Sequence, residues 1–562
     1  MPRMTGGRYI AEFLEAAGTT AVFYVPTILS RPLAEMDNMP IKRVLCHGEK
    51  AAAYMADGYA RASGKPGICG GQAVGAANIA AGLRDALLGN SPVICFSGGR
   101  MSNQKHKGAY QENDDLPVFE KLTKANFQVD EVGRLPDMLR QAFREATSGN
   151  PGPVNLQLFG NHGQLEDDFA DMELLVEKAY TQVPAHRPAP DRESVKEAAK
   201  HIMKAKRPVI VVGGGARLSG AGAEALELAE KLSIPIATSL ASYALIPEDH
   251  PLYFGVPGTY SRECTNQAIM QSDLVIYIGS KTGGQVTHFW QVPGPGTPVI
   301  QIGINPSDLG RNYPNPVSLV GDAKVSLKML IEEVQRGSGN AAWVADVQKL
   351  VATWRDSIMK LRNSDQSPIR PERLMKELGD VLPENALVVS DTGHTAMWIA
   401  QQLWINNKSW DFIRCAGSLG WGFPAAIGAK CGAPERPVIC LTGDGGFWYH
   451  LQELETAVRC NIPLVTVINN NNSLNQEYNI YTAAYDGKPS KKWGELWHFN
   501  EVSFAKMAEV MGALGIRVDD PAKIGPAVKQ ALASGRPAVV EVVGDIEALA
   551  PRAWVKAQSG KH

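Results

Sequence analysis

The sequence predicts an α/β protein made of three doubly wound domains, each built around a parallel sheet. Two observations predict this class: short apolar strand patterns alternate with helical patterns along the chain, and two seams divide that pattern into three parts. The length of 562 residues agrees with the division, because chains beyond about 250–300 residues split into several domains. We expect domains over residues 1–183, 190–337 and 365–562.

The first unit carries four apolar strand patterns separated by helical patterns. These strands are predicted over Ala21–Val25, Val44–Cys46, Val93–Ser97 and Val154–Leu158. The stretch of residues 184–191 then contains three prolines among polar residues. Prolines and polar residues at this density end regular structure, so this stretch is predicted to be a linker.

The second and third units follow the same alternation. In the second unit, strands are predicted over Pro208–Val212, Leu274–Ile278 and Pro298–Ile304, and the Gly321–Asp322 turn precedes its last helix. Residues 335–340 form the next seam, since glycine, serine and asparagine dominate there. The third unit begins with a helix near Pro371 and has predicted strands over Leu387–Ser390, Val438–Leu441, Leu464–Ile468 and Ala538–Val543.

The composition is that of an ordinary globular protein. Hydrophobic residues make up 44% and charged residues 20%, and 56 Lys and Arg against 58 Asp and Glu leave a net charge of −2. This balance gives no electrostatic reason to expect a nucleic-acid or membrane partner. No window approaches the ~20 apolar residues of a membrane span, and the first residues lack a secretory pattern. The eight cysteines lie in no metal-like or disulfide-like spacing, so we expect free thiols in a cytoplasmic protein.

The richest stretch of the chain runs from Leu441 to Glu477. An apolar strand breaks at a Gly-Asp-Gly-Gly turn, a helix follows, and a second strand ends in asparagines. Parallel strands joined by a helix end at the same sheet edge, where such folds bind ligands. There, glycine N–H groups approach an anion, and Asp444 with an asparagine oxygen holds a hard divalent cation. A plain tight turn with a polar loop is the alternative, which the order and spacing disfavour.

These residues resemble the GDG…NN signature of thiamine diphosphate enzymes, in which Mg²⁺ ties the diphosphate of the cofactor to the protein. The family places its asparagine 27 positions after the aspartate and a carbonyl ligand two positions later, which here gives Asn471 and Ser473. The resemblance therefore implies Asp444, Asn471 and Ser473 as metal ligands. It also implies that Gly443, Gly445 and Gly446 bind the cofactor, and that the three units are pyrimidine-binding, central and diphosphate-binding domains.

A second resemblance lies in residues 47–61, which match the family's HE-x-x-A-x-x-A-x-G-Y-A-R helix. Glu49 falls on the glutamate that hydrogen-bonds the cofactor's pyrimidine ring and favours its imino tautomer by proton exchange. Taken alone, Glu49 is equally a helix-start carboxylate favoured by the helix dipole. Because the chain also has the GDG…NN signature, we assign the catalytic role to Glu49. The family's preceding histidine is Gly48 here, so no role passes to His47.

Two further segments resemble the acetolactate synthase and pyruvate oxidase branch most closely. Residues 393–398 resemble a G-x-H-x-M-W turn, and residues 417–428 resemble a GTMGFGLPAAIGA segment. The resemblance implies that Gly393, His394, Thr395 and Gly417 line the cofactor site. It also makes Leu419 the apolar wedge that bends the cofactor, against the alternative of an ordinary core leucine.

Three polar residues are candidates for contact with the substrate. Gln111 lies in an F-Q-E-like position, Gln72 precedes a glycine turn that lines the active site in relatives, and Glu477 lies 33 residues after Asp444. Decarboxylases of the family place an acid at this last position to handle a proton. For Glu477 a solvated helix-start residue is an equal alternative, and the sequence leaves the two open.

Several departures from the family limit the prediction of the substrate. The family's P-G-G is Pro26-Thr27-Ile28 here, and the segment after Ser473 lacks both the acetolactate synthase pattern and its arginine–tryptophan pair. The histidine pair of pyruvate decarboxylases is also missing. In the central domain, Lys281 and Asn305 occupy positions where flavin-binding relatives have other residues. These differences disfavour FAD. FAD and a coenzyme A moiety are still alternatives to a central domain that binds no ligand.

The sequence thus predicts an enzyme dependent on thiamine diphosphate and Mg²⁺ that decarboxylates a 2-oxo acid with carboligation. The resemblance implies a homodimer or homotetramer whose active sites lie at the subunit interface. Rival hypotheses are a non-decarboxylating lyase of an acyloin, a cyclic diketone or a 2-hydroxyacyl-CoA, a flavin-dependent oxidase, and a non-catalytic cofactor-binding homologue. Residues 482–500 are either a lid over the site or a surface insertion.

Overall fold

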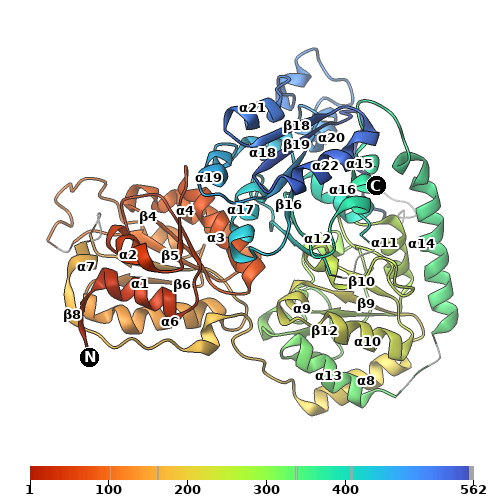
Figure 1. Cartoon of the computed structure of the whole chain (residues 1–562). Coiled ribbons are helices and arrows are strands. Elements are labelled where there is room, and N and C mark those ends of the chain that lie inside the picture. The colour runs from red at the N-terminus through yellow and green to blue at the C-terminus, as the bar shows by residue number, and fades with distance from the viewer. Residues whose placement is uncertain (102, 161–163, 336, 338–339, 406–408, 556–562) are drawn as a thin grey trace.

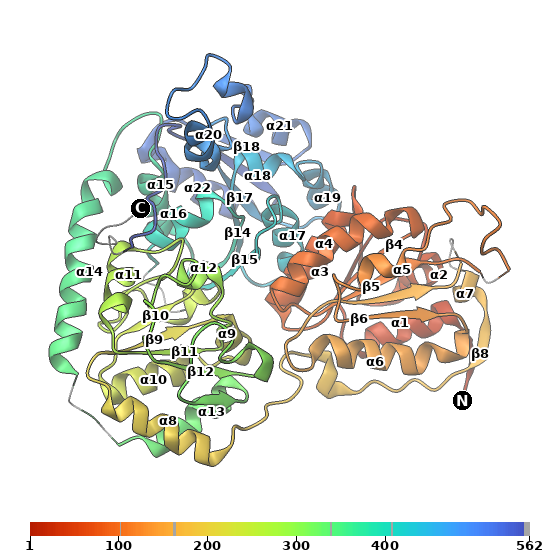
Figure 2. The same cartoon turned by 180° about the vertical axis from the view of Figure 1, so that it is seen from behind.

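The computed structural model describes residues 1–101, 103–160, 164–335, 337, 340–405 and 409–555. It contains three parallel sheets in three consecutive units, with helices packed against each sheet (Figure 1, and Figure 2 from behind). The predicted fold class is therefore confirmed. The domain limits stay a prediction, and Arg336, Ser338 and Gly339 of the predicted second seam lie outside the described residues.

The first sheet has six parallel strands. Their order is β3 (Lys42–Leu45), β2 (Ala21–Tyr24), β4 (Gly67–Gly71), β5 (Val93–Gly98), β7 (Val154–Leu158) and β6 (Ala125–Val129). Its helices are α1 (Gly6–Ala16), α2 (Ser30–Glu35), α3 (Glu49–Ser63), α4 (Ala76–Leu88), α5 (Leu116–Phe119), α6 (Leu135–Thr147) and α7 (Gln164–Asp167), and β1 (Arg3–Thr5) pairs with β8 (Phe169–Asp171). Successive residues of β2 enter different cores, Val22 with α1 and α6 and Phe23 with α3 and α4, as the alternation of a strand requires.

The central sheet has five parallel strands. Their order is β10 (Ile236–Thr238), β9 (Pro208–Val212), β11 (Leu274–Ile278), β12 (Val299–Gly303) and β13 (Ser318–Val320). Its helices are α8 (Arg192–Lys204), α9 (Gly214–Ser219), α10 (Gly222–Leu232), α11 (Glu263–Gln271), α12 (Gly284–Thr287) and α13 (Ala323–Glu333), followed by the long α14 (Ala341–Arg362). Asp191 and Asp322 cap α8 and α13, so helices begin where the linker and the Gly321–Asp322 turn end.

The third sheet again has six parallel strands. Their order is β15 (Asp411–Arg414), β14 (Leu387–Ser390), β16 (Val438–Gly443), β17 (Val465–Asn470), β19 (Ala538–Val543) and β18 (Leu514–Val518). Its helices are α15 (Pro371–Val381), α16 (His394–Gln402), α17 (Gly422–Gly432), α18 (Asp444–Trp448), α19 (Glu453–Arg459), α20 (Tyr478–Ala484), α21 (Phe504–Val510) and α22 (Ile524–Ala533). The short 3₁₀ helices are η1 (Met36–Asn38), η2 (Ala73–Gly75), η3 (Val132–Arg134), η4 (Lys178–Thr181), η5 (Leu240–Leu245), η6 (Pro306–Asp308), η7 (Asn475–Glu477), η8 (Trp493–Leu496) and η9 (Pro521–Lys523).

Six of the eleven predicted strands differ from the structure by one or two residues at an end, and two of these differences are instructive. The strand predicted over Leu464–Ile468 is β17, which runs to Asn470 because its ladder with β19 continues through Asn469 and Asn470. Two of the four asparagines are therefore part of the strand. The strand predicted over Val44–Cys46 is β3, which begins and ends earlier because its register with β2 starts at Lys42.

The first and third units meet where α3 packs against α17. Gly58 and Gly428 lie in this interface without a side chain between the helices. A Cβ on Gly58 would lie 2.0 Å from the carbonyl oxygen of Ala425, and one on Gly428 would lie 1.8 Å from that of Met55. Since real Cβ atoms do not approach oxygen so closely, the two backbones can touch only with glycine at both positions.

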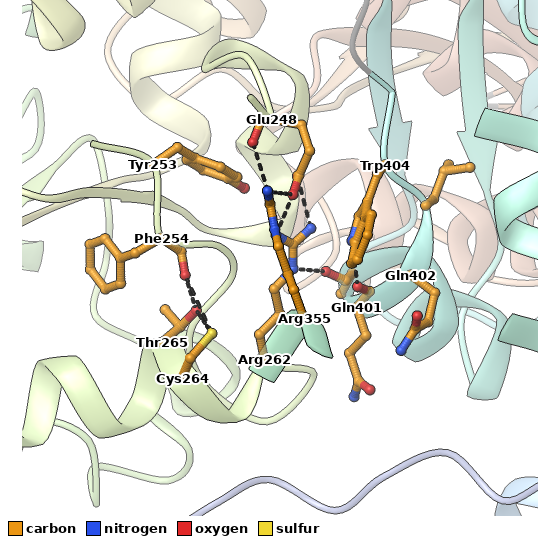
Figure 3. Close-up of polar contacts among 12 residues, drawn as sticks. Glu248, Tyr253, Phe254, Arg262, Cys264, Thr265, Arg355, Gln401, Gln402 and Trp404 are labelled. Atoms are coloured by element: carbon orange, nitrogen blue, oxygen red, sulfur yellow. Dashed lines mark hydrogen bonds and ion pairs between the residues drawn. The ribbon is translucent and has the colours of Figure 1, made fainter. Parts of the chain in front are cut away.

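The central unit is joined to the third unit by a buried ion-pair network (Figure 3). The Arg262 guanidinium donates two hydrogen bonds to Glu248, at 2.6 and 2.8 Å, and a third to the carbonyl oxygen of Ala400 at 3.2 Å. Arg355 of α14 donates to the same carboxylate. Ala400 belongs to α16, so the network fixes one end of a helix whose other end reaches the site described below.

The remaining fold-level expectations concern cysteines and membranes. All eight thiols are free, and all but Cys431 and Cys460 are buried. Within the described ranges, no helix combines the length and the apolar character needed to span a bilayer.

Candidate active site

A cavity of about 350 Å³ lies at the carboxyl ends of β14, β16 and β17. It brings together twelve of the residues that the sequence singled out: Gly393, His394, Thr395, Gly417, Leu419, Gly443, Asp444, Gly445, Gly446, Asn471, Ser473 and Glu477. These come from loops far apart in the chain. Parallel neighbouring strands explain the convergence, because their carboxyl ends share one sheet edge.

Asp444 is a buried carboxyl group in the wall of this cavity. It begins α18, is 2% exposed, and accepts a hydrogen bond of 2.7 Å from the backbone N–H of Ser473. Burial raises the pKa of its carboxyl from 3.8 to about 7, although backbone N–H groups partly offset this rise. Ionisation of such a buried carboxyl group is unfavourable on its own, but it becomes favourable when a cation lies beside it.

The donor set around Asp444 suits a hard cation. The amide oxygen of Asn471 accepts from the Ser473 hydroxyl at 2.9 Å, and the backbone carbonyl of Ser473 is the third donor that the family motif implies. One carboxylate with neutral oxygens is the chemistry that Mg²⁺ prefers when phosphate oxygens complete its shell. No cluster of three or more His, Cys, Asp or Glu that could hold a metal occurs among the described residues, so this mixed set is the candidate.

Two further residues of the cavity wall have features that suit the binding of an anion. His394 begins α16, its Nδ1 is buried without a hydrogen-bond partner in the described structure, and burial lowers its pKa to about 4. The imidazole is therefore neutral at pH 7 and has a free ring nitrogen to offer. Gly417 has no atom within 4 Å of where a Cβ would be, so a side chain there would project into the open cavity. The donors and the empty space together fit a diphosphate group.

The segment that carries Leu419 is held on both sides by buried carboxylates. Asp85 of α4 accepts the N–H groups of Ala416, Gly417 and Ser418 at 2.8, 3.2 and 3.0 Å. On the other side, Asp391 accepts the N–H groups of Gly420 and Gly422 at 3.1 and 3.0 Å. Leu419 therefore stands between two fixed turns of backbone and lines the cavity.

A charged network extends this anchoring into α3. Arg61 pairs with Asp57 at 2.7 Å and with Asp85 at 3.3 Å, and its guanidinium lies 4.8 Å from the ring centre of Trp421. The indole N–H of Trp421 donates to Asp57 at 2.8 Å. The wedge segment is thus tied to the first unit of its own chain by charge-assisted hydrogen bonds, which are the stronger kind.

Residues 482–500 pack against the loop of residues 471–474. Trp497 is 3% exposed and makes edge-to-face contacts with Trp493 and His498. Its carbonyl accepts from the N–H of Leu474 at 2.8 Å, and Phe499 donates to the carbonyl of Asn472 at 2.7 Å. The segment is therefore joined to the wall of the site, but none of its residues lines the cavity, so the lid and the surface insertion both stay hypotheses.

The candidates of the first unit do not line this cavity. Glu49 begins α3, where its carboxylate accepts from the Asn78 amide at 3.2 Å. Gln72 lies next to Thr27 at 3.4 Å, and Gln111 has a buried Oε1 without a partner in the described part of the chain. Apart from Tyr260 and Gln285, the cavity wall consists of third-unit residues. One chain alone thus holds the two halves of the predicted site apart.

Sequence reasoning missed several residues of the site. Tyr260 and Gln285 come from the central unit, and no local pattern places them at the third sheet. Asn469 was assigned only to a polar strand end, yet it also lines the cavity. Asp85 and Asp391 hold the wedge segment without touching the cavity. Their one signal was position: Asp85 lies in residues 82–86, which resemble a first-domain helix of the family, and Asp391 lies two residues before Gly393.

Three α/β units, with a cavity of oxygen donors and glycines at the edge of the third sheet, have the arrangement expected of an enzyme that uses thiamine diphosphate. The comparisons agree over most of the chain. Family models match residues 4–118 (thiamine pyrophosphate enzyme, N-terminal TPP binding domain), 195–330 (central domain) and 391–542 (C-terminal TPP binding domain). The chain belongs to the thiamine pyrophosphate enzyme family.

Its relatives include acetolactate synthases and a carboligase. It is 34% identical to a probable acetolactate synthase large subunit of Methanocaldococcus jannaschii, over 96% of this chain and 92% of the relative. It is 30% identical to the acetolactate synthase large subunit of Corynebacterium glutamicum, over 97% and 87%. It is also 30% identical to a glyoxylate carboligase of Escherichia coli O157:H7, over 94% and 91%. The chain is accordingly a thiamine-diphosphate-dependent enzyme of carboligation or decarboxylation, similar to acetolactate synthases.

Proposed function

We propose that this enzyme decarboxylates a 2-oxo acid and joins the remaining fragment to a second carbonyl compound, with Mg²⁺ as the metal. The observation that carries the proposal is the single cavity that unites the oxygen donors of Asp444 and Asn471 with the glycine cradle and Leu419. The names of the relatives, acetolactate synthase and glyoxylate carboligase, support the same reaction class. We place the reaction in the cytoplasm.

The cofactor supplies a nucleophilic C2 carbon and an electron-accepting ring when it is bound. The protein's part is positional. Asp444, Asn471 and the carbonyl of Ser473 would hold Mg²⁺, and the N–H groups of Gly445 and Gly446 would bind diphosphate at the start of α18. Leu419, on the segment fixed by Asp85 and Asp391, lines the same cavity and would be the apolar residue that bends the cofactor.

Glu49 is the proposed activating acid, and it would act in the cavity of a second copy of the chain. Its side chain is half-buried and packs against Gly71 and Gly75: a Cβ would lie 3.2 Å from Glu49 Cγ at the first position and 2.6 Å from Glu49 Oε1 at the second. The two glycines therefore leave room for the Glu49 side chain itself in this position. Since none of the described residues of the first unit lines the cavity, a homodimer or a tetramer of such dimers would complete each site.

Gln72, Gln111 and Glu477 are the proposed substrate-side residues. Glu477 ends η7 directly before α20 and lines the cavity, so it can reach a substrate proton. Gln111 has positive φ (60°) and an unpartnered buried oxygen, features that a bound substrate would explain.

Flavin is not part of the proposal. The glycine run at Gly213–Gly215 has a packing reason, because a Cβ on Gly213 would lie 2.4 Å from the carbonyl oxygen of Gly279. A cavity of about 300 Å³ nearby is lined by Lys281 and Arg217. If the enzyme is instead a non-decarboxylating lyase of a 2-hydroxyacyl-CoA, this is where a nucleotide portion would lie.

The test is CO₂ release from a panel of 2-oxo acids, with and without thiamine diphosphate and Mg²⁺, together with identification of the product. Release that depends on both additions, with an acyloin or acetohydroxy acid as product, is expected. Protein that binds the cofactor but releases no CO₂ would instead indicate lysis of an acyloin or diketone.

The shared site has its own test. Glu49→Gln and Asp444→Asn should each be inactive alone. Mixed and reassembled, they should regain up to half of the wild-type activity, since one site of each mixed dimer then has both residues. Failure to recover activity from proven mixed dimers would contradict the placement of Glu49.

A further inference from the structure

Arg100 is a buried cation whose hydrogen-bonding groups are mostly unused. It follows β5, is 5% exposed, and its Nη1 donates only to the carbonyl of the adjacent Gly99 at 3.0 Å. Its Nε and Nη2 are buried and have no partner among the described residues. A buried charge without a partner is strongly unfavourable, so this arrangement persists only if something else requires it.

The nearby acids do not satisfy Arg100. Asp115 and Glu112 act on its charge at a distance, but no carboxylate in the described part of the chain forms an ion pair with it. The Glu112 carboxylate instead accepts from the N–H groups of His106 and Ala109, and Asp115 accepts from Asn113. Burial lowers the pKa of the Arg100 guanidinium from its ordinary value, and Asp115 only partly offsets this effect.

Arg100 lies at the same sheet edge as the proposed catalytic residues of the first unit. In the register of β4 and β5, Gly71 pairs with Ser97, and a Cβ on Gly71 would lie 3.2 Å from the side chain of Glu49. Gly98 in turn lies against Gln72, with 3.5 Å between its Cβ position and the Cα of Gln72. Arg100 is two residues beyond Gly98, so its backbone lies a short distance along the chain from the contact with Gln72.

Two more polar atoms close to Arg100 in the chain lack partners. The hydroxyl of Ser97, three residues before Arg100, and the Oε1 of Gln111, next to the Glu112 whose charge acts on Arg100, are both buried without a hydrogen bond in the described structure. Three unused polar groups in one region indicate a bound polar ligand, because buried polar groups are nearly always paired in native proteins. Among these groups only Arg100 is charged, which makes the ligand anionic.

We propose that Arg100 binds an acid group of the substrate that is retained in the product. This inference rests on the proposed function. A carboxylate that leaves as CO₂ is poorly served by a fixed cation, because stabilising it in the ground state opposes its loss. A retained acid group has no such conflict, and Arg offers it two parallel N–H donors. Two sources fit: the carboxylate of a 2-oxo acid that acts as acceptor, or a second carboxylate, sulfonate or phosphonate on the donor.

The test variant is Arg100→Met in the full-length protein with thiamine diphosphate and Mg²⁺. Removing an unpaired buried cation should leave the melting temperature of the ligand-free protein unchanged or higher, whereas a structural arginine would lower it. Arg100→Lys keeps the charge and should recover part of the activity. Arg144→Met, the same exchange on the exposed face of α6, is the matched control.

Two kinetic arms separate the two sources. In the acceptor arm, pyruvate is the donor, and 2-oxobutanoate is compared with propanal, which lacks the carboxylate. In the donor arm, 2-oxoglutarate, sulfopyruvate and phosphonopyruvate are compared with 5-methyl-2-oxohexanoate and 4-methyl-2-oxopentanoate, which replace the second acid group by an isopropyl group. Arg100→Met should lower kcat/KM for the acid-bearing partner of one arm by about tenfold to a hundredfold, the value of a charged hydrogen bond. The matched neutral compound should be unaffected.

The outcomes are distinct. Selective loss in either arm, with cofactor affinity unchanged, supports the proposal and identifies the source. Equal loss for charged and neutral compounds, no loss in either arm, or a lowered melting temperature overturns it. Wild-type protein that shows no cofactor-dependent turnover in either arm contradicts the proposed function itself, and cofactor binding measured in parallel distinguishes that result.

Discussion

Replacing Asp85 with Asn tests whether the wedge segment depends on a carboxylate from another unit of the same chain. The side chain is fully buried and accepts three backbone N–H groups of residues 416–418 in addition to its pairing with Arg61. An asparagine keeps the shape but has one acceptor oxygen, and its NH₂ group faces donors. The change therefore removes at least one charged hydrogen bond and weakens the others.

The magnitude follows from these contacts. A hydrogen bond to a charged group contributes about 1.5–3 kcal/mol, and breaking a buried ion pair costs about 3–5 kcal/mol. Arg61 keeps its pairing with Asp57, so the lower end applies and we expect about 3 kcal/mol. If local opening governs exchange, the amide protons of residues 416–418 should exchange about a hundredfold faster.

Hydrogen exchange followed by mass spectrometry of the peptide around residues 416–418 measures this directly. Peptides from β7 serve as an internal reference that should not change. Asp137→Asn, which removes an exposed carboxylate paired with Arg134, is the control and should cost under about 1 kcal/mol. Exchange in Asp85→Asn within threefold of wild type would refute the reasoning.

Three further predictions follow from the site and the helix interface. Burial raises the pKa of Asp444 to about 7; the metal-free fold therefore binds more protons than the unfolded chain between pH 3.8 and 7, so its stability should fall as pH rises through that window. Mg²⁺ needs the carboxylate, so its affinity should drop about tenfold per unit below pH 7, and a flat Mg²⁺ titration between pH 5.5 and 8 would contradict the assignment. Gly58→Ala should push α3 away from α17 and lower the urea midpoint of unfolding by the equivalent of about 3 kcal/mol. The control Gly48→Ala should change the midpoint little, because no atom lies within 4 Å of its Cβ position. Equal effects of the two variants would argue against the helix contact. Gly417→Ala should keep the melting temperature but weaken thiamine diphosphate binding about tenfold by filling the cradle, and calorimetry showing unchanged affinity would place the cofactor elsewhere.

The sequence predicted strands well where both faces are buried. Val154–Leu158, Pro208–Val212 and Leu274–Ile278 have the predicted limits, because a strand covered on both faces is a continuous apolar run. The unpredicted β6, β10, β13, β15 and β18 are all sheet edges. Four of them are only partly buried, which leaves no such run, and the buried β10 has only three residues. Among the inner strands only β4 was unpredicted. Its sequence is rich in glycine because α3 lies on it, with a Cβ on Gly67 falling 1.9 Å from the carbonyl oxygen of Ala56.

The same limit applies to the site. The cavity residues of the third unit form short motifs whose spacing is visible in one dimension, so they could be named in advance. Asp85 and Arg61 act on residues more than 300 positions away, and such pairings leave no local pattern. Arg100 was not predicted either, because a single arginine after a strand is usually a solvated charge, and the sequence does not show that this one is buried.

The packing of α3 constrains how this enzyme can diversify. One helix presents Glu49 at its first residue and holds the wedge segment through Asp57 and Arg61, about two and three turns further on, with almost every residue between them buried. A substitution along it therefore alters two parts of the chemistry at once, so mutational tolerance should be low there and high in residues 101–112. New substrate preferences would then arise from substitutions in that loop, while the sequence of α3 is kept.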